Sequence, residues 1–260
     1  MKSIAQLESE AGTFSIETAM SEGWTLVSKH MLYYILGGII TVVISIAVGI
    51  IPFAGSLANS LILSPCLMAG AVYVTWRISR GIAWSDFGDM FKAFTYWAPL
   101  MVSTLIQGLI SILIAVLLLM NYIPEMMELY RLSEGTGTLT NKEEIKELIL
   151  GILNMKTAIL ISLTVILLGV MALIWCFKTH FIVIYKMQGW PAMELSRKVV
   201  MQNFIPLLGL FILMGLIIII SALPCGIGLL FTMPWMIGTT YSAFAQITDA
   251  HIGNEETVTY

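Results

Sequence analysis

An uncharged run from Ile205 to Leu223 limits most strongly what this chain can fold into. Its length and composition are typical of a helix that crosses a lipid bilayer. A turn at 224–226 ends the run, and a second apolar segment with Pro234 inside it follows. Because a helix satisfies its own backbone hydrogen bonds in lipid, the two segments are predicted to form a transmembrane hairpin. An amphipathic helix that begins at Pro191 precedes this hairpin.

The overall composition places the whole chain in the same class. Of its 260 residues, 58% are hydrophobic and 11% are charged, and the mean hydropathy is +0.90. A water-soluble surface of that size would need more polar groups, so the sequence predicts an integral membrane protein. The formal net charge of −3 supplies no basic surplus for binding phosphates, which argues against nucleic acid as a partner.

The same order of amphipathic helix and hairpin occurs near the N-terminus and, more loosely, in the middle of the chain. The middle copy starts at Ser85, runs through an apolar span to Pro124 and returns through 158–177. Three landmarks of the first unit match the last unit in order: Ala19 with Ala192, Pro52 with Pro224, and Pro65 with Pro234. Pro65 and Pro234 each remove a backbone donor inside a span, so both helices are expected to bend or break there.

These units together predict the fold class. We expect an all-α, polytopic membrane protein with six transmembrane helices, arranged as three helix-plus-hairpin units with interfacial amphipathic helices. The chain would form a single integral membrane domain over 1–260. Its units would span about 15–80, 85–188 and 189–248.

Basic residues on two connections predict the orientation in the membrane. Lysine and arginine loops stay on the cytoplasmic side, so both termini are expected to be cytoplasmic. The polar start of the chain lacks the early apolar core of a secretory signal, and the first span is therefore expected to be retained. The same basic residues are candidates for contact with lipid headgroups, although setting the topology would explain them equally well. They are Arg77, Arg80, Lys178, Lys186, Arg197 and Lys198.

One long connection, 121–156, differs from the others because it is mildly acidic, and it is predicted to lie outside. A capping box at 140–143 begins a helix in it. The apolar stripe of that helix includes Ile145, Leu148 and Ile149. This stripe is a candidate contact for another membrane protein; a solvated connection without a partner is the alternative.

Candidate chemistry within the spans is sparse. The six predicted spans lack Asp, Glu, Lys and Arg, which coupled transporters use for protons or ions. Polar residues that could line a cleft are Asn59, Gln107 and Gln246, although hydrogen bonding between helices is the more common use of such residues. The histidines, at the predicted membrane edges or in the tail, have no metal-ligand spacing. We therefore predict no metal, no cofactor, no catalytic residue and no enzymatic activity.

The last unit also carries a resemblance to known proteins. The run 181–204, the segment PCGIG, the segment TMPW and Tyr241 together resemble the repeated unit of poorly characterised bacterial inner-membrane proteins. The unit is also similar to the membrane domain attached to some glycerophosphoryl diester phosphodiesterases. The chain has no soluble phosphodiesterase domain, so that activity is not carried over. The matching residues are Gly189, Ala192, Ser196 and Asn203, echoed by Gly23, Trp24 and Pro52 in the first unit. The resemblance implies a bacterial inner-membrane location, six helices and an unassigned role.

Two classes of function remain open at the level of sequence. The first is a non-catalytic membrane protein that contacts lipids or a partner membrane complex. The second is a carrier or channel for an uncharged or amphipathic solute. A bound lipid or a polar central cavity would distinguish them.

Overall fold

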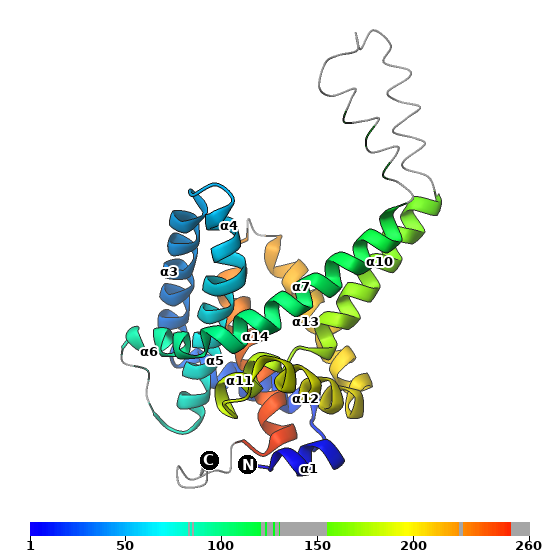
Figure 1. Ribbon diagram of the computed structural model, residues 1–260. Coiled ribbons are helices and arrows are strands. Elements are labelled where there is room, and N and C mark those ends of the chain that lie inside the picture. The colour runs from blue at the N-terminus through cyan, green and yellow to red at the C-terminus, as the bar shows by residue number, and fades with distance from the viewer. Residues whose placement is uncertain are drawn as a thin grey trace. The chain divides into compact units, whose positions relative to one another are not determined.

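The structure, a computed structural model, describes residues 1–82, 84, 86–120, 123, 127, 130, 155–223 and 226–250 (Figure 1). The predicted contact residues Ile145, Leu148 and Ile149 lie outside the described residues, as does nearly all of the connection 121–154. The turn residues Pro224 and Cys225 are outside them too.

Every regular element formed by the described residues is a helix, which confirms the predicted all-α class. In chain order the elements are α1 (Ile4–Ser9), α2 (Ile16–Ser28), α3 (Met31–Gly49), α4 (Ala54–Ala58), the π-helix η1 (Asn59–Leu63), α5 (Ser64–Ser79), α6 (Gly88–Phe91), the 3₁₀-helix η2 (Lys92–Tyr96), α7 (Trp97–Leu119), α10 (Met155–Ile174), α11 (Lys178–Ile184), α12 (Gly189–Gln202), α13 (Phe204–Ala222) and α14 (Leu229–Thr248).

Among the described residues, five stretches of helix are long and apolar enough to cross a membrane, as expected for an integral membrane protein. They are Met31–Gly49, Ala54–Ser79, Gly88–Leu117, Ala158–Ile184 and Phe204–Ala222. The sixth predicted span, α14, is not among these five, so six spans stay a prediction. The reason lies in its side chains, because α14 carries threonine, serine and glutamine between its apolar residues.

The chain divides into two compact units. The first unit contains Met1–Leu105 and Leu173–Tyr260, and the second contains Ile106–Ala172. In the second unit the described residues belong almost entirely to parts of α7 and α10, whose side chains are mostly apolar and exposed. The polar contacts discussed below all belong to the first unit.

Helix α14 is the most enclosed long helix of the first unit. Helices α2, α3, α5 and α13 contact it. Twelve of its 20 residues are buried. An aromatic group that includes Phe177, Phe181 and Phe244 fills the space between α11 and the second half of α14. The core of this unit therefore lies along α14.

The N-terminal segment folds back onto the end of α14. A capping box between Ser3 and Gln6 starts α1. The backbone N–H of Lys2 donates to the Thr248 carbonyl at 2.9 Å, and that of Gly12 donates to the Ile247 carbonyl at 3.0 Å. The start of the chain and the end of α14 consequently lie on the same side of the first unit.

The two prolines inside predicted spans have different local effects. The π-helix η1 ends two residues before Pro65, so the regular α-helical pattern is interrupted just ahead of this proline. Helix α14, in contrast, is α-helical on both sides of Pro234. The predicted bends therefore do not take the same local form, and the three-unit repeat stays a prediction.

Candidate functional site

The backbones of α2 and α14 approach closely at two glycines. A Cβ atom added to Gly23 would lie 2.4 Å from the backbone nitrogen of Thr239. One added to Gly238 would lie 2.4 Å from the Gly23 carbonyl oxygen. Both obstacles are backbone atoms, which cannot rotate away, so only glycine fits at either position. Small residues of this kind allow membrane helices to pack backbone against backbone.

A polar clasp, formed by Ser15, Glu22, Ser242 and Gln246, holds the two helices beside this contact. The Glu22 carboxylate accepts hydrogen bonds from Ser242 Oγ at 2.5 Å and from Gln246 Nε2 at 3.2 Å. The Gln246 side-chain oxygen accepts from the Ser15 N–H at 3.1 Å. Ser15 also caps α2, because its hydroxyl accepts from the Thr18 N–H. The clasp thus fixes where α2 begins on α14.

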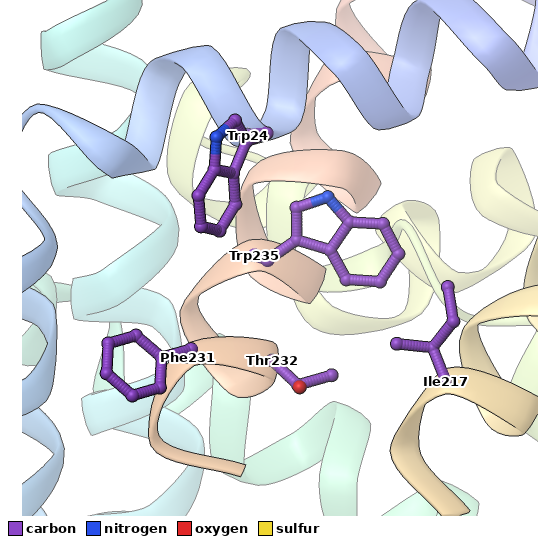
Figure 2. A pocket seen from close by; sticks show the side chains of 5 residues that line it. All are labelled: Trp24, Ile217, Phe231, Thr232 and Trp235. Atoms are coloured by element: carbon purple, nitrogen blue, oxygen red, sulfur yellow. The ribbon is translucent and has the colours of Figure 1, made fainter. Parts of the chain in front are cut away.

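An aromatic groove opens where α2, α13 and α14 meet. Figure 2 shows its lining side chains, Trp24, Ile217, Phe231, Thr232 and Trp235, around a hollow of about 260 Å³. The Trp235 indole N–H donates to the Met20 carbonyl at 3.2 Å, which fixes one wall of the groove. The Thr232 hydroxyl oxygen lies 2.6 Å from Ser221 Oγ and 2.9 Å from the Gly228 carbonyl. The polar atoms of Thr232 and Trp235 are therefore already engaged within the protein.

The predicted polar cleft is divided in the structure. Gln246 belongs to the clasp, and Gln107 belongs to the second unit. Asn59 lies in the π-helix η1, where its buried Oδ1 finds no hydrogen-bond partner in the part of the chain that is described. A solute or a water molecule could use this Oδ1 atom of Asn59.

Three of the six predicted basic residues pair with carboxylates. Arg77 pairs with Asp89, and Lys198 with Glu8 at 3.1 Å. Arg197 donates to both oxygens of Glu194, and these hydrogen bonds hold the pKa of the Glu194 carboxyl below its ordinary value.

The other three have different surroundings. The Arg80 guanidinium lies 5.3 Å from the centre of the Trp76 ring, in a cation–π contact. Lys178 is half-buried, whereas Lys186 is exposed and has a positive φ of 54°. These positions neither require nor exclude lipid headgroups, so headgroup contact stays a prediction for all six residues.

Asp89 was not singled out by any sequence pattern above. It is only 6% exposed and also pairs with Lys92 at 2.6 Å. Its pairing joins α5 to α6, because Arg77 lies in the last turn of α5. The candidate helices extend beyond the predicted uncharged spans, so Ala54–Ser79 includes Arg77, Gly88–Leu117 includes Asp89 and Lys92, and Ala158–Ile184 includes Lys178. The i,i+3 spacing of Asp89 and Lys92 was the available signal.

His180, which was predicted to lie at a membrane edge, is enclosed by aromatic residues. It is 4% exposed, and its ring stacks on Phe244 at 4.9 Å between centroids. Neither ring nitrogen has a hydrogen-bond partner among the described residues. In the described ranges, no group of three or more His, Cys, Asp or Glu side chains could hold a metal ion.

No family model, curated protein or solved structure matches this chain. The suspected kinship with bacterial inner-membrane proteins of the helix-plus-hairpin type therefore stays a prediction from the residues quoted above.

Proposed function

We propose that this chain is a non-catalytic integral membrane protein whose work is to contact lipids or a partner membrane complex. The observation that carries the proposal is the exposed apolar surface of its long helices. In four of the five candidate spans, only 11–17% of the residues in the most apolar window are buried. Exposed apolar surface of this extent has to be covered by lipid tails or by another apolar protein surface.

The use of polar side chains in the first unit supports this proposal. Within the clasp, Glu22 accepts a hydrogen bond from Ser242. Asp89 pairs with Arg77 and Lys92. The Tyr34 hydroxyl lies 2.7 Å from the Thr75 hydroxyl. Polar groups that bond to each other in this way fix helices relative to one another. Their arrangement suits a scaffold that presents apolar surfaces at its outside.

The hydrogen bonds that join the N-terminal segment to the end of α14 support six crossings of the membrane. Lys2 and Thr248 share a hydrogen bond and must lie on the same side of a bilayer. The chain between them then crosses an even number of times. Five candidate spans together with α14 give six crossings. With the basic residues inside, both termini would be cytoplasmic, and the resemblance favours a bacterial inner membrane.

Purification in a mild detergent, followed by phosphate analysis of extracted lipid, tests the proposal. We expect the protein to retain phospholipid or a second membrane protein. If the outer connection is the partner contact, changing Ile145, Leu148 and Ile149 to serine should release the partner and leave bound phospholipid unchanged. Protein that stays folded but retains neither lipid nor a partner would contradict the proposal.

One observation favours a second function, a carrier for an uncharged solute. The unpartnered Oδ1 of Asn59 lies in a π-helix, an irregularity that is frequent at functional sites. Solute flux into proteoliposomes that is lost in Asn59→Ala, but kept in the neighbouring Ser60→Ala, would support a carrier over a purely lipid-contacting protein.

A further inference from the structure

We propose that the aromatic groove holds one acyl chain of a membrane lipid, with the ester end of that lipid beside α2. This inference rests on the proposed function, because it names which part of the protein binds lipid. It assigns a binding site to Trp24, Ile217, Phe231, Thr232 and Trp235, with a hydrocarbon chain as the ligand.

The chemistry of the groove selects an apolar ligand. Three of the five lining side chains are aromatic and one is aliphatic. The hydroxyl of Thr232 and the indole N–H of Trp235 are already bonded to Ser221 and Met20. A polar solute entering the hollow would lose hydrogen bonds to water and gain few in return. A hydrocarbon chain makes no hydrogen bonds to water and therefore loses none when it enters the hollow.

The surroundings of the groove identify the source of that chain. One wall is Ile217 of α13, and α13 is among the candidate spans. Along this helix Leu216, Ile219 and Ile220 are 52–64% exposed. The groove thus borders a helix whose other faces are apolar and exposed, where bilayer lipids would be the neighbouring molecules.

The two tryptophans give the lipid a direction. In Figure 2 both indole nitrogens lie on the side of α2, and the Trp24 ring extends from there towards Phe231. The indole N–H of Trp24 has no hydrogen-bond partner among the described residues, and Trp24 is 48% exposed. Tryptophan prefers this amphipathic position at the membrane interface, with its N–H towards polar lipid groups. An ester carbonyl beside α2 would accept that hydrogen bond while the chain extends towards the start of α14.

Tryptophan quenching by brominated lipids tests the proposal on the full chain in detergent. Phosphatidylcholine with bromine in its acyl chains is added in small steps while tryptophan fluorescence is recorded. We expect a saturable phase at about one lipid per protein, stronger with bromine near the ester end than near the methyl end. The Trp24→Phe variant should lose a large part of that phase.

Two variants on the same helix separate the groove from the general lipid surface. Ile217→Phe fills the hollow and should abolish the saturable phase, whereas Ile219→Phe makes the same change on the exposed flank and should leave it intact. Continued burial of the Cys66 thiol confirms that each variant is folded.

The possible failures are distinguishable. Quenching that rises without saturation, is equal in both variants and does not depend on bromine position would overturn the groove and leave general lipid contact in place. Absence of quenching by any brominated lipid would overturn the groove and the lipid-contacting form of the proposed function, and would leave contact with a partner membrane complex as its remaining form.

Discussion

Helices α13 and α14 are neighbours in sequence and similar in length, yet most residues of α13 are not buried and most residues of α14 are. Three of the 19 residues of α13 are buried, against twelve of the 20 in α14. The more apolar helix is therefore the more exposed one. A helix surrounded by lipid needs apolar side chains on most sides, while a helix surrounded by protein can use polar and small residues that its neighbours satisfy. High hydropathy here accompanies an exposed helix surface rather than a central place in the fold.

Small and polar residues of α14 serve its contacts with other helices. Gly238 and Thr239 meet Gly23 of α2, and Thr232 meets Ser221 of α13. Such residues lower hydropathy, and they also allow close packing. Variants at these positions should therefore affect α14 much more than equivalent changes affect α13.

The largest effect is expected at the glycine contact. Gly238→Ala forces a methyl group into backbone atoms of α2 and should destabilise the fold by about 2–3 kcal/mol or more. The double variant that also carries Gly23→Ala should be less stable still. Gly215→Ala on α13 is the matched control, since nothing lies within 4 Å of its added Cβ. That change should be neutral or slightly stabilising.

This prediction can be checked by heating protein whose only cysteine is Cys66, which is buried, in the presence of a thiol-reactive fluorophore. The temperature at which Cys66 reacts should fall strongly for Gly238→Ala. Equal behaviour of Gly238→Ala and Gly215→Ala would contradict the close approach of α2 and α14.

The next effect concerns the clasp. Glu22→Ala removes the carboxylate that accepts from Ser242 and Gln246, although Gln246 keeps a weaker hydrogen bond to Ser242 Oγ at 3.3 Å. The change should cost about 1.5–2 kcal/mol, at the lower end of the range for hydrogen bonds to a charged group. Glu17→Ala removes an exposed glutamate from the first turn of the same helix and should cost less than about 0.5 kcal/mol. The same thiol assay distinguishes the two. A larger loss for Glu17→Ala would show that α2 is held by its helix dipole and not by the clasp.

A smaller effect is expected where α14 meets α13. Thr232→Val removes the hydroxyl that reaches Ser221 and should cost about 0.6 kcal/mol, the average for hydrogen bonds between membrane helices. Thr240→Val is the control on the same helix, because the Thr240 hydroxyl donates only to the Met236 carbonyl of its own helix. If both variants lower the temperature at which Cys66 reacts by the same amount, the hydrogen bond between Thr232 and Ser221 contributes nothing to the stability of the fold.

The smallest effect is expected outside this contact network, at the exposed pair of Glu194 and Arg197 on α12. Arg197 lowers the pKa of Glu194, so the pair stabilises the fold above the ordinary carboxyl pKa and loses its effect as the pH falls through the lowered value. Exposed pairs contribute little, and Glu194→Gln should leave the reaction temperature of Cys66 unchanged at neutral pH. If Glu194→Gln clearly lowers the reaction temperature of Cys66 at neutral pH but not in acid, the pair contributes more to stability than its exposure indicates.

The sequence allowed much of the fold to be predicted, because its strongest signals are long uncharged runs. The helices at Met31–Gly49 and Phe204–Ala222 coincide closely with the apolar runs. Helix α2 was expected as the amphipathic helix of the first unit, and its landmark residue Ala19 is fully buried. A helical period in a long window is unambiguous, and lipid requires helices in such a chain.

The partners of these helices could not be predicted. Periodicity identifies the apolar face of α2 but not what covers it, and we expected a helix in the lipid interface where α14 covers much of that face. Likewise Gln246 was considered for a solute path, yet it bonds to Ser15 and Glu22, more than 200 positions away in sequence. Contacts between residues so distant in sequence leave no trace in local patterns.

The side of the membrane reached by each end of α14 tests the central claim most directly. In protein with Cys66, Cys176 and Cys225 changed to alanine, single cysteines are placed at two exposed residues, Glu10 near the N-terminus and Ile227 just before α14. Sealed membrane vesicles of both orientations are then treated with a membrane-impermeant thiol reagent. We predict that Glu10→Cys reacts only from the cytoplasmic face and Ile227→Cys only from the opposite face, because we expect α14 to cross the membrane despite its modest hydropathy. Reaction of both cysteines from the same face would contradict a crossing α14.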